Sequence, residues 1–294
     1  MLNKVNTSHG LPVLLMNVKS FFLFYLVLAL RYLLIAGPAF FIFYRLYQLK
    51  FSSRKIQSRF PKNKDYYREI GYSFFTFIIF ALIGVVLLLP AVRSHTRIYT
   101  DIADYGGAYF VISFVLSLLI HDAYFYLTHR LMHHPKLFKV FHLLHHRSTN
   151  PSPWAAFAFS PLEAVVEGSI IFVIALLIPI HPLAILAFLL FMTIYNVYGH
   201  LGYEIYPQWV VNSPVGKWLN TSTNHNMHHQ YFKGNYGLYF RFWDELFRTT
   251  HPHYDATLAK LVGKPKKDEA LENALIPNYS ASPSAKKSTT ETRS

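Results

Sequence analysis

Cysteine is absent from all 294 residues of the chain. This absence excludes disulfide bonds, thiolate metal ligands, iron–sulfur clusters and CxxC redox motifs. Any metal ion that the protein binds must therefore be held by nitrogen and oxygen atoms. No GxGxxG dinucleotide motif is present either, so the electrons for any redox reaction would have to come from another protein.

Charged residues are also scarce. They make up 15% of the chain, whereas a typical soluble domain has about 25%. The apolar residues occur in long runs, and five of these are long enough for a bilayer core that needs roughly 20 apolar residues. They cover 21–47, 70–92, 108–128, 162–180 and 183–200. We therefore predict an all-α, polytopic bundle of membrane helices, in which the last two runs form a tight hairpin that either crosses the membrane or turns back within it.

Acidic residues are few: 15 against 28 basic residues, which gives a formal net charge of +13. The basic residues gather between the first two apolar runs, as Lys50, Arg54, Lys55, Arg59, Lys62, Lys64 and Arg68. Dense Lys/Arg loops tend to stay on the cytoplasmic side and can bind anionic lipids. We therefore predict no nucleic-acid partner and place 50–68, 129–161 and 201–294 on the cytosolic side of a bacterial inner membrane or the endoplasmic reticulum.

Histidine is abundant where these runs end. Nine histidines form three short motifs, HRLMHH (His129, His133, His134), HLLHH (His142, His145, His146) and HNMHH (His225, His228, His229), and His200 follows the fifth run. Spacings of three to five residues bring side chains to nearly one helix face. Because one tetrahedral ion needs about four ligands, ten imidazoles indicate two metal ions on the cytosolic side.

Other interpretations of the histidines remain. His9, His95 and His181 stand alone and are predicted to be structural, whereas His121, on the same face as His129 but deeper, is left open. Bis-histidine haem does not explain the adjacent pairs. A metal transporter would need polar groups along several spans, and a metal-dependent lipid hydrolase seldom needs two ions held only by nitrogen. A redox-active metal beside lipid instead favours oxidation of an unactivated C–H bond, which zinc cannot perform.

The three motifs, in this order, resemble the membrane-bound fatty acid hydroxylase and sterol desaturase superfamily. The strings NPSPWAAFAFSPLEA at 150–164 and HHQYFKGNYGLYFRFWDELF at 228–247 are most similar to sterol C-5 desaturases and their bacterial relatives. The resemblance implies a non-haem di-iron centre that uses O2 to hydroxylate or desaturate a sterol-like or fatty-acyl lipid. It also implies that the motif histidines and His200 ligate metal, where both His133 and His134 fit the second position of the first motif and both are kept, and that His129, His145 and His228 are essential for catalysis.

The resemblance suggests four further residues around the metal. Asp122, seven residues before the first motif, matches an aspartate of the family. Asp122, Glu163 and Glu204 are candidates to accept hydrogen bonds from ligand imidazoles, although each could equally cap a helix. Asn196 occupies a position where some relatives have histidine, and could bind metal through water.

The chain is predicted to have three portions: membrane anchor helices with the basic loop at 1–107, a catalytic domain at 108–256 and a polar, disordered tail at 257–294. A separate electron-donating reductase or carrier is expected to dock on the cytosolic face, against loop 50–68. Zinc or nickel could replace iron in purified protein, because imidazole ligands bind both at least as well as ferrous iron.

Overall fold

The computed structural model describes residues 10–263, and this part of the chain is built of helices without a β-strand. The long helices are α1 (Gly10–Phe41), α2 (Asn63–Leu88), α4 (Gly106–Met132) and α9 (Pro182–Gly199). The shorter helices are α3 (Pro90–Arg93), α5 (Pro135–Phe141), α6 (Leu143–His146), α7 (Pro161–Gly168), α8 (Ile170–Leu177), α10 (Gln208–Val211), α11 (Ser222–Tyr231), α12 (Phe242–Leu246) and α13 (Tyr254–Val262). The predicted all-α membrane fold is confirmed.

Four segments are long and apolar enough to span a membrane: Met16–Leu46, Asn63–Leu88, Gly106–Met132 and Pro182–Gly199. The fourth predicted run, 162–180, is not one continuous helix. It divides into α7 and α8 at Ser169, whose hydroxyl bonds back to the Val165 carbonyl. The preceding Gly168 packs so closely that a Cβ there would lie 2.5 Å from Ile83 Cδ1.

The turn between α8 and α9 lies at the end of the bundle away from the histidine motifs. There the backbone of Ile180 forms an isolated parallel β-bridge with that of Ile98, in the loop that follows α2 and α3. His181 Nδ1 accepts from the Leu183 amide at the start of α9, and its Nε2 lies 3.1 Å from the Thr100 carbonyl oxygen. His181 is therefore structural, as predicted, and the pair α7–α8 and α9 extends along the bundle as a hairpin.

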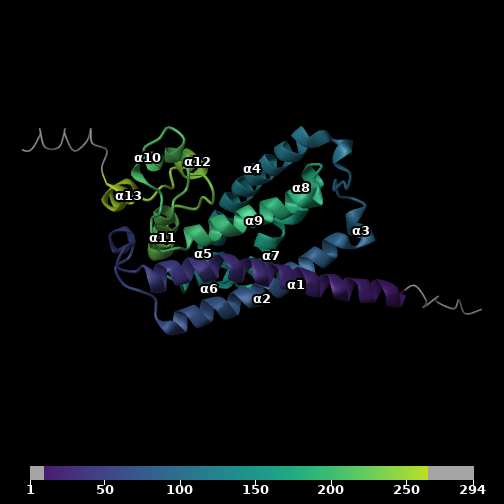
Figure 1. The fold of residues 1–294 in the computed structure, drawn as a ribbon, viewed down its shortest axis with the longest axis horizontal. Helices are drawn as coiled ribbons and strands as arrows, with labels where there is room; N and C mark the ends of the chain where they lie inside the picture. Colours follow the sequence, from purple (N-terminus) through teal and green to yellow (C-terminus); the bar gives the residue numbers. More distant parts are fainter. Residues whose placement is uncertain (1–9, 264–294) are drawn as a thin grey trace, which may run out of the picture.

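Helices α1 and α2 pack side by side along the bundle (Figure 1). Segment Pro153–Phe157 lies against both of them, because the Trp154 carbonyl accepts hydrogen bonds from Tyr32 of α1 and Ser73 of α2. Large apolar side chains such as Phe22, Leu34 and Leu127 remain exposed on the long helices. This exposure is what a lipid-facing surface requires.

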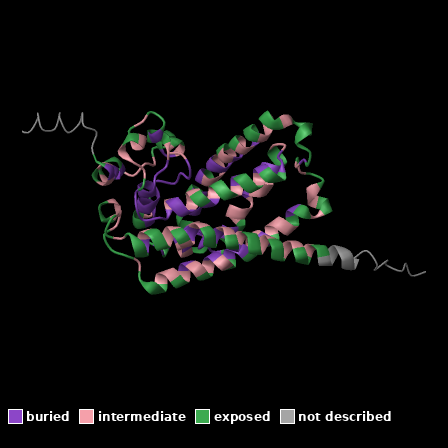
Figure 2. Ribbon diagram, viewed as in Figure 1, coloured by how far each residue is buried: buried purple, intermediate pink, exposed green. Residues whose placement is uncertain are grey.

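Helices α5, α6 and α10 to α13 lie toward one end of the bundle and form a cap with the adjoining ends of α4 and α9, and buried residues are concentrated around α11 (Figure 2). The predicted basic loop contacts this cap. The backbone of Lys55 forms an isolated antiparallel β-bridge with that of Tyr203, and the Gln57 side chain donates a hydrogen bond to the Asn226 side chain of α11. The predicted tail boundary at 257 was wrong, since α13 continues to Val262. Leu258 and Val262 pack on Met227 and Tyr254, and this burial keeps the segment helical. The rest of the predicted tail, 264–294, lies outside the described residues.

Candidate metal centre

The structure gathers nine histidines of the cap into two adjacent groups. The five-histidine group consists of His129, His133, His142, His146 and His228. The four-histidine group consists of His145, His200, His225 and His229. Within each group, one ring nitrogen per residue lies within 4.8 Å of the others. All nine are buried except His133, which is partly exposed. Two sets of rings are the arrangement expected for two metal ions.

The spacing within a motif decides which group each ring joins. His142 and His146 are four residues apart, so both project from one helix face into the five-histidine group. His145 projects in another direction and joins the four-histidine group. The HNMHH motif does the reverse: its first and last histidines join the four-histidine group, and His228 joins the other. Each HxxHH motif thus gives two rings to one group and one ring to the other.

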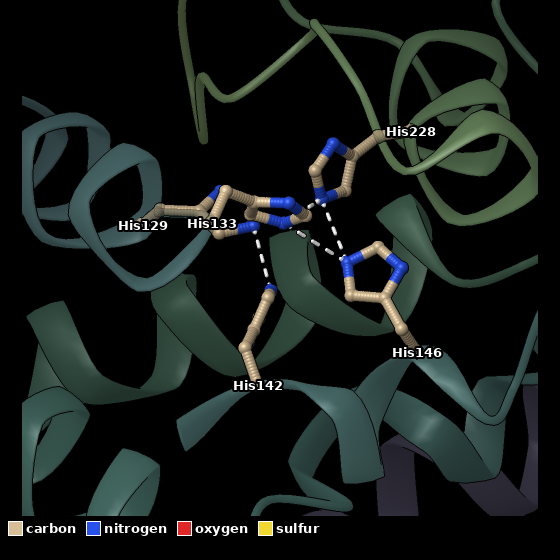
Figure 3. Close-up of side chains that lie close together, drawn as sticks. All are labelled: His129, His133, His142, His146 and His228. Atoms are coloured by element: carbon tan, nitrogen blue, oxygen red, sulfur yellow. Dashed lines mark hydrogen bonds between the residues drawn. The ribbon is translucent and has the colours of Figure 1, made fainter. Parts of the chain in front are cut away.

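The Nε2 atoms face one another within both groups. In the five-histidine group, Nε2 of His129 lies 2.9 Å from that of His142, and those of His133, His146 and His228 lie 3.0 to 3.1 Å apart (Figure 3). In the four-histidine group, the corresponding contacts are 3.1 to 3.3 Å. Two ligand atoms about 2.05 Å from one ion lie about 2.9 Å apart at a right angle and about 3.3 Å apart at the tetrahedral angle. The spacing therefore fits metal coordination.

The opposite ring nitrogens fix the tautomers. Nδ1 of His129 lies 2.9 Å from the Tyr236 carbonyl oxygen, and Nδ1 of His228 lies 2.7 Å from the Gly234 carbonyl oxygen. Nδ1 of His200 lies 2.7 Å from the Asn196 carbonyl oxygen. A carbonyl can only accept, so each Nδ1 carries the proton and each Nε2 carries a lone pair. Lone pairs gathered at this spacing repel one another unless a cation lies between them.

Burial also favours the neutral form of four ligand rings in the folded protein. Burial, followed by repulsion from neighbouring imidazoles, lowers the pKa of His145, His225, His228 and His229 well below its usual value. Imidazole must be deprotonated to bind a metal ion. The protein environment thus keeps these four rings ready to ligate at neutral pH.

His134, predicted as a ligand together with His133, lies outside both groups. It is exposed and precedes α5, where its Nδ1 accepts from the Lys136 amide at 3.4 Å. The turn at Pro135 directs it away, because the helical position four residues after His129 belongs to His133. His121 also lies outside the groups: its Nδ1 is 2.9 Å from the Tyr239 hydroxyl oxygen.

The four residues predicted around the ligands have different roles. Glu163 contacts a ligand directly, with Oε1 2.6 Å from His142 Nδ1, and a capping box at the start of α7 holds it there. Asn196 positions His200, but through its backbone carbonyl; its side chain bonds the Ala156 carbonyl. A role for this side chain as a water-linked ligand is therefore not supported.

In the described structure neither Asp122 nor Glu204 bonds a ligand imidazole, so of their two predicted roles the contact with a ligand is not supported. Asp122 accepts from the backbone amides of Tyr239 and Phe240. Glu204 accepts from the amide and hydroxyl of Thr223 in the first turn of α11. Both carboxylates hold backbone segments of the cap rather than the rings themselves.

The residues that sequence reasoning missed act through backbone carbonyls. The segment containing Gly234 and Tyr236 is held by Asp244, which accepts from the Tyr236 amide. Gly234 has φ +80°, and a Cβ there would lie 2.7 Å from the Thr249 carbonyl oxygen. A side chain at this position would therefore displace the carbonyl that orients His228. No residue type identifies a carbonyl acceptor, so only the glycine and Asp244 could have indicated this segment.

An apolar cavity of about 510 Å³ extends from the metal centre along the bundle. At one end it is lined by Phe125 and Phe159, whose ring centroids lie 4.8 Å from that of His129 and 5.2 Å from that of His145. Thr100, in the loop beyond α3, also lines it. The cavity thus reaches two phenylalanine rings that pack on the two histidine groups, one ring on each group. Its volume lies within the usual range of ligand pockets, about 300–1,000 Å³.

Comparisons with known proteins agree with this site. Residues 114–249 match the fatty acid hydroxylase family. The chain is 34% identical over 186 residues to Delta(7)-sterol 5(6)-desaturase ERG3B of Gibberella zeae, covering 63% of this chain and 56% of that protein. It is 30% identical to Delta(7)-sterol 5(6)-desaturase of Leptosphaeria maculans (76% and 56% covered) and 27% identical to lathosterol oxidase of Homo sapiens (61% and 59% covered).

The chain spans a little over half the length of these relatives. No solved structure matches it. The matched residues contain the nine motif histidines, His200 and the residues that hold them. The chain is therefore related to the membrane-bound fatty acid hydroxylase and sterol desaturase superfamily, with sterol C-5 desaturases among its relatives, as its histidine motifs predicted.

Proposed function

We propose that this protein is a membrane oxidoreductase that binds two iron ions and uses O2 to hydroxylate or desaturate a lipid, with a sterol-like lipid as the preferred class. The observation that carries the proposal is the convergence of two sets of imidazole Nε2 atoms beside a long apolar cavity. The names of the relatives, which are sterol desaturases and lathosterol oxidase, support the sterol class.

The five-histidine group would hold one ion and the four-histidine group the other. When bound, the iron ions would supply the redox chemistry that cleaves an unactivated C–H bond, which acid–base side chains cannot do. The chain's own residues set the conditions for this reaction. Glu163 and the carbonyls of Gly234, Tyr236 and Asn196 orient the rings, as outer hydrogen bonds do in other metal sites.

Phe125 and Phe159 separate the imidazoles from the cavity with apolar surface. They would exclude water from the reacting hydrocarbon and hold the substrate beside both groups. His121 and Asn196 also line the cavity. Most of the other lining residues are apolar, so the cavity suits a mostly apolar molecule and does not suit an ion that must pass along the bundle. The lining therefore favours lipid oxidation over metal transport.

The electron donor would be a separate reductase or carrier that docks on the cytosolic face. Loop 50–68 is a suitable place, because Gln57 contacts Asn226, which follows the metal-site residue His225. Its exposed basic residues Lys62 and Lys64 could attract an acidic partner. The excess of lysine and arginine in this loop also supports a cytosolic position for the metal centre.

The proposal is tested by expressing the chain in a host that supplies sterols and by comparing lipids with mass spectrometry. A lipid that gains one oxygen atom, or loses two hydrogen atoms, only with the intact protein and only in the presence of O2 supports the function. His142→Ala is the matched control without product. Released head groups would instead indicate a hydrolase, and altered metal uptake without a lipid product would indicate a transporter.

A further inference from the structure

Helix α12 has an apolar side that the described residues, 10–263, leave exposed. Phe242 and Leu246 are four residues apart and share one helix face, and their exposed fractions are 49% and 56%. Phe247, which directly follows the helix, is 44% exposed. Neighbouring exposed apolar side chains usually mark a surface that contacts a protein or a membrane.

The helix lies against a membrane-spanning helix. The rings of Trp243 and Phe247 stack on Tyr126 of α4, with centroid distances of 6.1 Å and 5.5 Å. Leu127 and Leu131, which follow Tyr126 along α4, are more than half exposed, in a helix long and apolar enough to span a membrane. Exposed leucines on such a helix face lipid. Helix α12 therefore adjoins the lipid-facing surface of α4.

The contact with α4 also sets the depth of α12. Tyr126 is six residues before Met132, the last residue of α4, which is about 9 Å along the helix. Amphipathic segments that lie in a bilayer interface bury their apolar side roughly 5–10 Å deep, at the boundary of headgroups and acyl chains. The position of α12 thus matches the interface rather than the bilayer core or the aqueous phase.

Positive charge borders the same face. The guanidinium carbon of Arg130, exposed in the last turn of α4, lies 5.4 Å from the ring centroid of Phe247. Lys217 is exposed next to Trp218, whose carbonyl accepts from the Arg241 amide at the start of α12. Within residues 10–263, neither Arg130 nor Lys217 forms an ion pair. Both cations are thus available to anionic lipid headgroups.

We propose that α12 lies in the bilayer interface beside the metal centre, with its exposed face on the acyl chains and with Arg130 and Lys217 bound to anionic phospholipid headgroups. A second copy of the chain would cover the same face, but a symmetric dimer places identical patches together and would bring these cations close to one another. Anionic headgroups instead neutralise them, so charge favours lipid as the occupant.

The other side of α12 holds a segment of the metal centre. The carboxylate of Asp244 is buried and accepts from the amides of Tyr236 and Gly237. The Tyr236 carbonyl in turn accepts from Nδ1 of His129. One short helix thus contacts lipid on one side and fixes the ring-orienting segment on the other. Lipid contact at Leu246 is therefore expected to slow the loss of metal from the five-histidine group.

Site-specific fluorescence quenching tests the position of α12. Because the chain has no cysteine, one introduced cysteine carries one bimane fluorophore. The full chain is labelled in nanodiscs at Leu246→Cys, at Leu119→Cys, which is exposed in the middle of α4, and at Ala256→Cys, which is exposed on α13 at the outer end of the cap (Figure 1). We expect position 246 to be quenched by phospholipid spin-labelled near the headgroup, position 119 by phospholipid spin-labelled deep in the acyl chain, and position 256 by aqueous iodide.

The lipid charge is tested in the Leu246→Cys chain. Spin-labelled phosphatidylglycerol should quench position 246 more effectively than phosphatidylcholine, by about fivefold for each cation that binds a headgroup. Arg130→Gln together with Lys217→Gln should remove this preference. Equal quenching of the unmodified surface by the two lipids would overturn the binding of anionic headgroups.

Two results would overturn the interfacial position itself. One is quenching of position 246 by iodide to the same extent as position 256. The other is protection of position 246 from iodide and from lipid alike, because protein would then cover the face, and a dimeric particle would identify that protein as a second copy. Quenching requires neither metal nor substrate, so this test does not depend on the proposed function.

Metal retention tests the connection to the metal centre. Leu246→Glu places a charge in the interface, and because Leu246 is exposed the substitution disturbs little packing. Zinc-loaded Leu246→Glu in nanodiscs should lose metal to a chelator about tenfold faster than the wild type, the lower end of the effect of outer partners of ligands. Ala256→Glu is the matched control and should equal the wild type. Equal rates in all three would overturn the effect on the metal centre.

Discussion

The two histidine groups differ in how firmly their rings are held. In the five-histidine group, Nδ1 of His142, His129 and His228 contacts Glu163 and the carbonyls of Tyr236 and Gly234, respectively. In the four-histidine group, Asn196 anchors His200, whereas Nδ1 of His229 has no hydrogen-bond partner within residues 10–263. Within the same residues, Nδ1 of His146 is the unpaired counterpart in the five-histidine group, so these contacts hold three of five rings there against one of four. Ligand number and outer hydrogen bonds both raise metal affinity. We therefore expect the five-histidine group to bind its ion more tightly.

The largest effects are expected from removing one ligand of each group. His142→Ala and His229→Ala should each lower activity more than about 100-fold, because even outer partners of ligands change activity 10- to 100-fold. Each should also lose about one of two bound metal ions, as measured by elemental analysis.

His134→Ala is the matched control for these variants, since His134 is exposed and outside both groups. It should keep the metal content and activity of the wild type. A normal metal content in His229→Ala, or loss of metal in His134→Ala, would show that the division into two groups is incorrect.

Glu163→Gln should separate orientation from ligation. It keeps the shape of the side chain but removes the charge next to His142, so metal affinity in the five-histidine group should fall about 10- to 100-fold. Asp122→Asn is the comparison, because Asp122 bonds backbone amides and no ligand ring. Metal titration measures both, and equal losses in the two variants would mean that Glu163 acts only through folding.

Gradual chelation should empty the four-histidine group first. If its ion dissociates about tenfold faster, as one missing outer hydrogen bond would predict, a half-depleted state should accumulate. Metal content and product formation are followed together during dialysis against a chelator. In Glu163→Gln the two groups should lose their ions at more similar rates. Simultaneous loss of both ions from the wild type would contradict the expected difference in affinity.

Acid should destabilise the metal-free protein. Burial lowers the pKa of His145, His225, His228 and His229 in the folded state, whereas an unfolded chain has the ordinary value of about 6.5. Below that pH the unfolded state binds more protons, so stability is present above pH 6.5 and falls as the pH falls, by up to about 1.4 kcal/mol per pH unit for each ring.

Thermal unfolding of metal-free protein in nanodiscs at pH 7.5, 6.5 and 5.5 measures this effect. The decrease in Tm should be smaller in His229→Ala, which has one titrating ring fewer, and unchanged in His134→Ala. A Tm that stays constant over this range would mean that the rings do not remain neutral in the folded cap.

The smallest effect is expected from the basic loop. Lys62→Glu and Lys64→Glu together should slow turnover with a reductase several-fold, mainly through the association rate, and should not change metal content. Arg68 is unsuitable for this test because it bonds Asp65 and Ser148. Unchanged turnover at low salt would place the docking surface elsewhere.

Much of the architecture could be predicted from the sequence because it depends on local order. Long apolar runs predict four of the helices, since any such run must be shielded from water. The i,i+4 spacing of His142 and His146 brings their rings to one face whatever the rest of the fold is. The order of the three histidine motifs was sufficient to predict the relation to the superfamily.

The tertiary structure decided how these local features meet. It placed His145, and likewise His228, in a different group from the other two histidines of its own motif. It also selected His133 over His134 as a member of the five-histidine group, through the turn at Pro135. It also brought the carbonyls of Gly234 and Tyr236 to the rings, which residue type cannot indicate because every residue has a carbonyl. Helical period fixes the direction of a side chain within its own element, but packing of distant elements decides what lies opposite, and the metal centre depends on both.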